Sequence, residues 1–448
     1  MTAPSLLDRG QRAGLRLLTR AGAIPVLENG VVRRRVARVL HRGATGGFAA
    51  QAAVGRTFAR RTASGQAVRT RPTTPAGMFD LRPSEEQEML RAAARRLADE
   101  VIRPAGRIAD DERRVPDAVR ASAAEMGLGL VGVPAALGGV AEEHPAVTTC
   151  LVLEELARGD LSIAVALMAS GSVATTVARY GTADQQATYL PHLTARDRVD
   201  AITPVPTGLE AALAIHEPQP LFDPRAPRIT ATRRRGSLVL DGTKALVPLA
   251  RTAELFVVSA LLDGDARLVL VPAATPGVLL EDDPAMGLRA AATGRLVLRS
   301  AVVPDDHLLG TVDDHLDLIR RARLGWSACA VGTAQAALDQ LVPYVKERRA
   351  FGAPIAHRQA VAFTVADIAI ELDALRLVVW RAAARLDAGL DAARHVAEAR
   401  RLVARHGTWI GSNAVQLLGG HGFVKEWANE RWFRDLRGAG LLEGTLTV

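Results

Sequence analysis

The feature that most constrains the fold is a hydrophobic pattern that changes twice along the chain. From Phe79 to about Ala195 apolar residues follow helical spacing, and Ser84 stands before "EEQEMLRAAARRLADEVI" as a typical helix N-cap. Near Asp200 the pattern becomes short β-branched runs such as "ELFVVSALL" and "RLVLVP", separated by Gly, Asp and Pro. From Asp313 the helical spacing returns. The sequence therefore predicts a mostly helical α+β protein with a compact antiparallel β domain between two helical domains.

We expect four segments, beginning with a basic arm and linker and ending with a helical domain. In that last domain "VADIAIELDALRLVVW" places apolar residues three and four apart, which is the spacing of one buried helix face. Long helices of this kind suit a four-helix bundle. The core of such a bundle can lie within one chain or be shared between subunits. The segments are residues 1–78, 79–195, 196–310 and 311–448, and the expected buried face is Val365, Ile368, Leu372, Leu375 and Val379.

The positive charge is concentrated in residues 1–78, which hold 14 Arg, no Lys and two acids, a balance of +12 against +8 for the whole chain. Within this arm, "LLDRGQRAGLRLLTR" and "VVRRRVARVL" place apolar residues at helical spacing with Arg on the other face. Three interpretations stay open: docking to a membrane surface or partner, a mitochondrial-type presequence, and a solvated extension. "RTRPTTPAG" then indicates a linker.

The composition argues against several classes of protein. A basic arm with only Phe48 and Phe58 as aromatic residues does not indicate a nucleic-acid binder. Cys150 and Cys329 lie far apart and suit core thiols in a reducing compartment. We see no uninterrupted apolar run of about 20 residues, as a membrane-spanning helix requires. Arg with almost no Lys suggests a GC-rich bacterial source, so we expect a cytoplasmic protein, membrane-associated if the arm docks there.

The motif "LLEGTLTV" at residues 441–448 places one carboxylate, Glu443, among apolar residues. By itself it indicates a solvated tail. Walker, zinc-spaced and serine-elbow motifs are absent from the sequence, and "GGHG" at 419–422 follows a helical pattern rather than a strand, so it does not indicate a dinucleotide fold of the Rossmann type.

Several segments agree in order and spacing with one known family. They are "LEELARGD" and "YGTADQQATYLPHL" in the first half, "AMGLRAAATGRLVLRSAVVPDDHLLG" in the middle, and "RARLGWSACAVGTAQAALD", "VKERRAFGAPIAHRQAVAFTVADIA", "QLLGGHGFVKEWANERWFRDLR" and "LLEGT" in the last part. Over residues 79–448 the chain resembles the acyl-CoA dehydrogenase family. The arm lies outside the resemblance.

The resemblance implies a flavoprotein of lipid metabolism, a homotetramer or dimer, that oxidises an acyl-CoA thioester. Such an enzyme gives the α proton to a carboxylate and the β hydride to FAD, and electron-transferring flavoprotein is the usual acceptor. Glu443 matches the catalytic base, and Gly444 and Thr445 match the residues that follow it, Thr445 contacting flavin. Arg323 matches the arginine that begins the helix lining the active site. Arg348, Phe351 and Gln359 match positions that hold the adenine half of FAD across a subunit interface, and Gln416 and Gly420 match further contacts to the dinucleotide.

The chemistry of the reaction agrees with this assignment of Glu443. A thioester α hydrogen is weakly acidic, so its removal needs a base beside the carbon and donors for the enolate oxygen. A carboxylate among Leu441, Leu442 and Leu446 should be partly desolvated, which strengthens a base. The family's other location for the base is Ala322 here, which cannot accept a proton.

The flavin-facing motifs depart from the family pattern. In "HEPQPLFD", His216 stands where the family has Thr and Phe222 where it has Ser. In "KALVPL", Leu246 replaces Trp and Pro248 replaces Thr, and proline offers neither hydroxyl nor N–H. Two interpretations follow: an enzyme with an unusual flavin pocket, in which His216 supplies a hydrogen bond, or a non-catalytic subunit that supports flavin in a partner chain. The retained Glu443 favours the enzyme.

Overall fold

The computed structural model describes residues 81–141, 145–194 and 208–448. The predictions for the basic arm lie outside these residues. The segment Phe79–Val448 forms one compact unit in which the helices and the central sheet share contacts.

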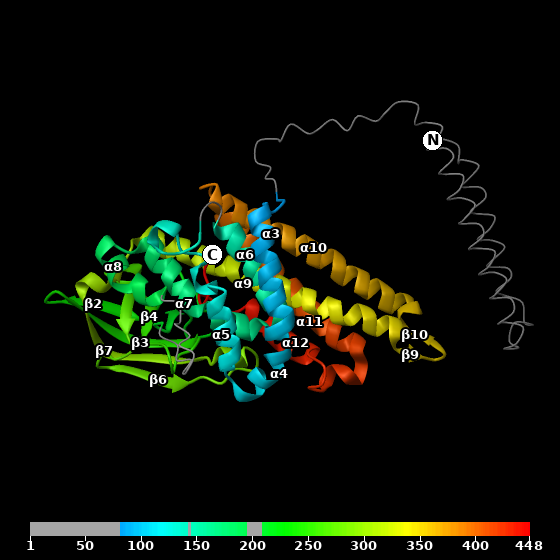
Figure 1. Ribbon diagram of the computed structural model, residues 1–448. Coiled ribbons are helices and arrows are strands. Elements are labelled where there is room, and N and C mark those ends of the chain that lie inside the picture. The colour runs from blue at the N-terminus through cyan, green and yellow to red at the C-terminus, as the bar shows by residue number, and fades with distance from the viewer. Residues whose placement is uncertain (1–80, 142–144, 195–207) are drawn as a thin grey trace, which may run out of the picture. The chain divides into compact units, whose positions relative to one another are not determined.

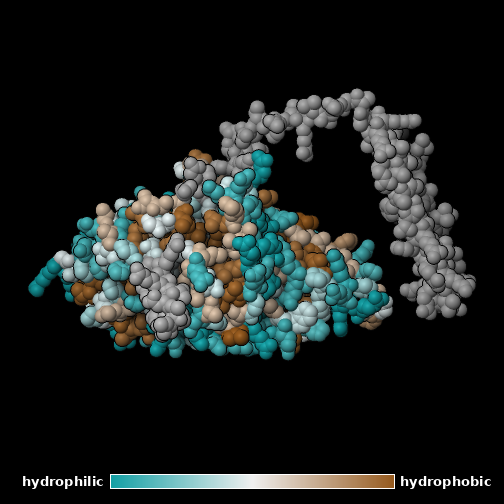
Figure 2. Space-filling model, viewed as in Figure 1, coloured by the Kyte–Doolittle hydropathy of each residue, from teal (hydrophilic) through white to brown (hydrophobic). Residues whose placement is uncertain are grey.

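The first part of this unit is helical, as the spacing predicts. Ser84 caps the first helix, since its hydroxyl accepts from the backbone N–H of Gln87 at 3.2 Å and the Gln87 side chain bonds back to the Ser84 N–H. The helices are α3 (Glu85–Leu97), which continues through one π-helical turn (Ala98–Ile102) into α4 (Arg103–Glu112), then α5 (Asp117–Glu125), α6 (Pro145–Gly159), α7 (Leu161–Tyr180) and α8 (Ala183–Leu193). Figure 2 shows the surface of α3 as a hydrophilic band flanked by apolar areas.

Helix α7 is the one helix of the described segments long and apolar enough to cross a membrane, but 89% of its most apolar window is buried inside the protein. The sequence reading did not single it out because Ser, Thr and Gly interrupt its apolar residues. Its place in the fold is that of a core helix between α8, the sheet and α9 (Figure 1).

The central β domain is present, and its sheet is mixed. Its order is β6-β7-β3-β2-β4-β5-β8, with β1 also paired to β4. The pairings β1–β4 and β2–β4 are parallel and the others are antiparallel, so the expected purely antiparallel arrangement holds only in part. The strands are β1 (Ala211–Ala214), β2 (Thr230–Arg234), β3 (Ser237–Val247), β4 (Leu255–Leu262), β5 (Asp265–Pro272), β6 (Val278–Asp282), β7 (Gly294–Pro304) and β8 (Leu308–Leu309).

Both parallel pairings are made along the same strand, β4. Strand β1 pairs with Leu255–Val258 and β2 with Leu261–Leu262, so they lie one after the other along β4. The chain between them, residues 215–229, leaves the sheet as a loop. This loop carries the "HEPQPLFD" motif.

The last part contains three long helices, α9 to α11, and the short helix α12. The two-stranded hairpin of β9 (Arg349–Ala350) and β10 (Ala353–Pro354) lies in the connection between α9 and α10. The predicted stripe is confirmed for Ile368, Leu372, Leu375 and Val379, which are at most 3% exposed, whereas Val365 is only half-buried. The helices are α9 (Val312–Glu347), α10 (Gln359–Asp387), α11 (Ala393–Leu418) and α12 (Asn429–Ala439). Because α12 is short, the predicted four-helix bundle is complete along only part of its length.

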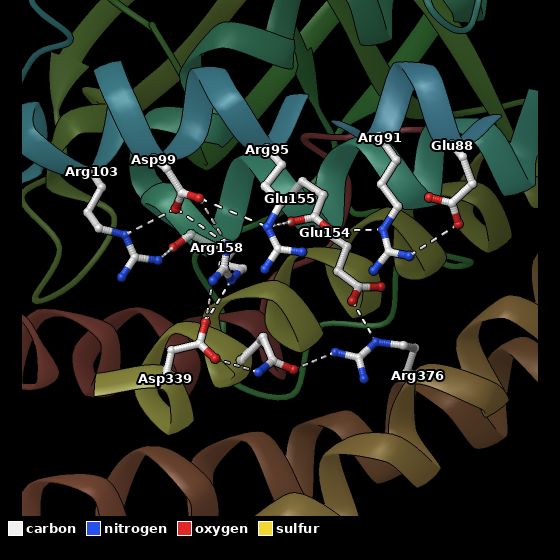
Figure 3. Close-up of polar contacts among 11 residues, drawn as sticks. Glu88, Arg91, Arg95, Asp99, Arg103, Glu154, Glu155, Arg158, Asp339 and Arg376 are labelled. Atoms are coloured by element: carbon white, nitrogen blue, oxygen red, sulfur yellow. Dashed lines mark hydrogen bonds and ion pairs between the residues drawn. The ribbon is translucent and has the colours of Figure 1, made fainter. Parts of the chain in front are cut away.

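A layer of ion pairs joins the two helical parts (Figure 3). Glu154 of α6, 3% exposed, accepts from Arg376 of α10 at 2.6 Å, and Arg158 contacts Asp339 of α9 at 2.6 Å. Burial raises the pKa of Glu154, and the Arg376 charge opposes that shift. A buried carboxylate of this kind depends on its cation, because an unpaired charge in the interior costs several kcal/mol, of the order of 3–5.

Candidate active site

The segment around Glu443 is part of the core and is not a solvated tail. Residues 442–448 are all buried, with Glu443 at 7% exposed. Leu446 and Val448 pack beside Gly325 of α9, where an added Cβ would lie 3.2 Å from the Leu446 Cβ. Burial of two large aliphatic side chains holds this segment against α9.

Three hydrogen bonds from two helices fix the segment. The Trp326 indole donates to the Gly444 carbonyl at 2.6 Å, and the Ser172 hydroxyl of α7 accepts from the Thr447 N–H at 3.2 Å. The buried Arg321 donates to the Val448 carbonyl at 2.9 Å. Helices α7 and α9 thus hold the backbone that follows the carboxylate.

The Glu443 carboxylate pairs with two guanidinium groups. Arg323 donates through Nε to Oε2 at 2.9 Å and through Nη2 to Oε1 at 2.8 Å, and Nη2 of Arg400 lies 3.6 Å from Oε1. The expected leucine surroundings are therefore wrong in part, since Leu441 is 73% exposed and cations contribute the nearest groups. Arg323 is also not the start of its helix, because α9 already begins at Val312.

The backbone after Glu443 is strained. Gly444 has φ +76° and Thr445 has φ +81°, a left-handed conformation that is unfavourable for a β-branched residue. A Cβ on Gly444 would lie 2.4 Å from Cγ1 of Ile215, the first residue of the loop. Strain of this kind persists where the surrounding structure over-determines it, often at functional sites.

His216 faces the same region from the β domain. It is half-buried, its Nδ1 is buried without a hydrogen-bond partner in the described residues, and its ring meets Phe222 edge-on at 5.5 Å. Burial lowers the pKa of His216, while the Glu443 charge opposes the shift. The site therefore contains an imidazole whose buried Nδ1 is available to a ligand.

A buried ion pair supports the loop. Lys244 of β3, 0% exposed, donates to Glu217 at 2.8 Å and to the Ile215 carbonyl at 3.1 Å. Burial lowers the pKa of Lys244 to about 8 although Glu217 favours its charged form. Next to it Leu246 has φ +52° and donates its N–H to Asp283 at 3.0 Å. Pro248 is buried.

The residues expected at the adenine half lie elsewhere. Arg348 ends α9, and the Tyr344 hydroxyl links that end of α9 to the Leu418 carbonyl at the end of α11 at 3.0 Å. Arg323 and Arg348 are about 37 Å apart along the helix axis, more than one extended dinucleotide can bridge. The structure brings together His216, Arg323, Glu443, Gly444 and Thr445, and at the other end of α9 it gathers the exposed residues Arg348, Phe351, Gln359, Gln416 and Gly420.

Sequence analysis did not identify two residues of the site, Arg400 and Asp283. Arg400 is one of several arginines in "EARRLVARHG", and nothing in that pattern separates it from its solvated neighbours. Asp283 stands in an acidic "EDD" run that reads as a surface turn. The signals that place both residues are contacts between segments far apart in the sequence.

The sequence matches known domains over most of this structure. Residues 84–197, 212–301 and 316–448 match the N-terminal, middle and C-terminal domains of acyl-CoA dehydrogenase. The short-chain specific acyl-CoA dehydrogenase of Bos taurus mitochondria is 33% identical over 375 residues, which are 81% of this chain and 88% of that protein. The chain belongs to the acyl-CoA dehydrogenase family.

Solved structures agree with this assignment. The chain is similar to a glutaryl-coenzyme A dehydrogenase solved in complex with glutaryl-CoA, with TM-score 0.72 and 27% identity. The match covers 81% of the present chain and 92% of the solved chain. A structure described as the electron transferring flavoprotein of Acidaminococcus fermentans is similar with TM-score 0.73 and 25% identity, over 82% and 96% of the two chains.

The cofactor of the acyl-CoA dehydrogenase family is FAD, and the residues of this site fit it. The orphaned Nδ1 of His216 offers a hydrogen bond, and Gly444 allows the backbone to come close to Ile215 where any side chain would collide. Leu246 and Pro248 match flavin-facing positions of the family pattern and carry no side-chain donor.

Proposed function

We propose that this dehydrogenase removes the α and β hydrogens of a short-chain acyl-CoA thioester, with Glu443 as the base. The single observation that carries the proposal is the Glu443 carboxylate. It is buried, held at a strained turn, and lies beside an imidazole whose buried nitrogen has no partner in the described residues. Because Arg323 and Arg400 offset the cost of burying the charge, it is the strained turn and the unpartnered imidazole that distinguish this carboxylate from a structural ion pair.

Each residue of the site has a separate role in the proposed reaction. Glu443 takes the α proton, for which one of its oxygens must leave Arg323 and face the substrate, since proton transfer needs hydrogen-bond reach. Arg323, with 24% of its side chain exposed, is able to swing aside. When bound, FAD supplies the acceptor for the β hydride. His216 and Thr445 orient the flavin ring.

The exposed residues at the other end of α9 support an FAD site that is shared between two subunits. Arg348, Phe351, Gln359, Gln416 and Gly420 are exposed and too distant from Glu443 to serve the same FAD within one chain. We therefore propose that they hold the adenine half of FAD bound to a neighbouring subunit, in a homodimer or homotetramer. Electrons then pass to an electron-transferring flavoprotein, and the reaction takes place in the cytoplasm or at a membrane surface.

Two observations support a short acyl chain. Leu446 and Val448, at most 2% exposed, fill the space beside Gly325 of α9, two residues along the helix from Arg323. The bovine relative is named as short-chain specific. A long acyl chain would have to displace these side chains, at a cost of roughly 1.5–3 kcal/mol for each one exposed.

The test is anaerobic bleaching of the FAD-loaded protein by acyl-CoA thioesters of increasing chain length. We expect the fastest reduction with butyryl-CoA, and in Glu443→Gln a rate lower by about 10²–10⁴ with FAD content and substrate binding retained. Glu426→Gln removes an exposed acid and serves as the matched control.

Wild-type rates in Glu443→Gln would refute the assignment of the base. A wild-type protein that binds FAD but is bleached by no thioester would instead favour the non-catalytic, flavin-supporting subunit. The replacements at Phe222, Leu246 and Pro248 are the observations consistent with that second function.

A further inference from the structure

Arg400 lies behind the carboxylate, on the side away from solvent. It belongs to α11, and its side chain is 10% exposed against 24% for Arg323. Burial lowers the pKa of Arg400, and the Glu443 charge opposes that shift. A buried guanidinium is costly unless its donors are used.

The donors of Arg400 are used on the backbone that leads to Glu443. Nη1 donates to the carbonyl of Ala439, the last residue of α12, and Nη2 donates to the carbonyl of Leu442. One planar fork therefore ties both ends of the turn 439–442, and it satisfies a carbonyl that a helix end leaves without a partner. Gly440 of this turn lies so close to α11 that a Cβ would be 2.7 Å from the Ala404 Cα.

The two arginines at Glu443 are therefore not equivalent. Arg323 holds both carboxylate oxygens and is partly exposed, so it can be displaced when substrate enters. Arg400 is fixed by two backbone carbonyls, and its Nη2 lies 3.6 Å from Oε1, so its position does not depend on Arg323.

We propose that Arg400 is the positioning residue for Glu443. It fixes the turn 439–442 and keeps a buried positive charge beside the carboxylate while Arg323 moves away. This inference rests on Glu443 being the base, and it adds a residue that acts only through Glu443. A displacement of the base by about 1 Å can reduce a rate by about 10²-fold, which sets the expected size of the effect.

The first experiment compares Arg400→Lys, Arg400→Gln and the control Arg401→Gln, whose side chain is exposed on the same helix. In FAD-loaded protein, the butyryl-CoA dependence of flavin reduction separates KM from the limiting rate. We expect the limiting rate to fall about 100-fold in Arg400→Gln and about tenfold in Arg400→Lys, which keeps the charge but cannot span two carbonyls. KM and the control should change less than about twofold by the same reasoning.

The second experiment needs no turnover. Unfolding of Arg400→Gln, Glu443→Gln and the double variant forms a cycle, in which we expect the two losses to be non-additive by about tenfold in the unfolding equilibrium constant. Additive losses together with a wild-type limiting rate would overturn the inference while the proposed function stands. If no thioester reduces the wild-type flavin, the proposed function fails, and the cycle alone then decides whether Arg400 positions Glu443.

Discussion

Replacing Gly444 by Ala tests whether the strained turn is what places Glu443, the proposed base. At φ +76° an L-residue costs roughly 1–2 kcal/mol relative to glycine. The new Cβ would lie 2.4 Å from Cγ1 and 2.5 Å from Cβ of Ile215, neither of which is the flexible end of a side chain. Carbon atoms pack at about 3.5–4.0 Å, so the segment must move by about 1 Å or more.

The two costs together predict a large effect on both stability and rate. Overpacking of a core adds about 1–3 kcal/mol, so Gly444→Ala should lose roughly 2–5 kcal/mol of unfolding free energy. Because the movement displaces Glu443, reduction of the flavin by butyryl-CoA should slow by about 10²-fold. Urea unfolding of the FAD-loaded protein and anaerobic stopped-flow measurements give the two quantities.

Gly438→Ala is the matched control. Gly438 lies within α12, and a Cβ there would meet Leu288 at 3.5 Å, an ordinary contact. Alanine in a helix is favoured over glycine by about 0.8–1.0 kcal/mol, so this variant should be as stable as the wild type or more stable. If Gly444→Ala behaved like the control in stability and rate, the reasoning about the turn would be refuted.

Three further outcomes are expected. Arg348→Ala should lower FAD affinity about ten- to a hundredfold, because it removes one charge-assisted hydrogen bond of about 1.5–3 kcal/mol; unchanged FAD content at limiting FAD would contradict this. Deletion of residues 1–75 should leave FAD content intact and weaken salt-sensitive binding to anionic vesicles or a partner, whereas an insoluble product would show that the arm belongs to the core. Arg376→Met should cost about 3–5 kcal/mol of unfolding free energy, because it leaves the buried Glu154 without its cation, and a loss below 1 kcal/mol would contradict that reading.

The pH dependence of stability supplies another outcome. Burial lowers the pKa of His315, which is 0% exposed and pairs with Ser259, from 6.5 to about 4. Between these values only the unfolded chain takes up the proton, so the stability is present above pH 6.5 and about 3 kcal/mol is lost as the pH falls to 4. The variant His315→Gln should lose about 3 kcal/mol less unfolding free energy than the wild type between pH 6.5 and 4. Denaturant unfolding at several pH values measures this difference.

The order of helices and strands followed from local pattern. Helix α3 begins after Ser84, and the face of α10 that holds Ile368 and Leu372 is buried, because capping and three-four spacing are properties of adjacent residues. The parallel pairing of β1 and β2 with β4 could not be read in the same way. Sheet partners are chosen by contacts between strands far apart in sequence, and an alternating strand looks the same whether its neighbour runs parallel or antiparallel.

At the site, the sequence by itself determined which carboxylate is proposed as the base, since "LLEGTLTV" offers one carboxylate and the family motif matches it. It also determined which residues depart from the motif, such as His216 and Pro248. The tertiary structure alone decided that Glu443 is buried, that Arg323 and Arg400 are its counter-ions, and that Arg348 lies at the far end of α9. The reason is physical: the charge state and reach of a side chain depend on neighbours that meet only after the chain has folded, and those contacts leave no periodic trace in the sequence.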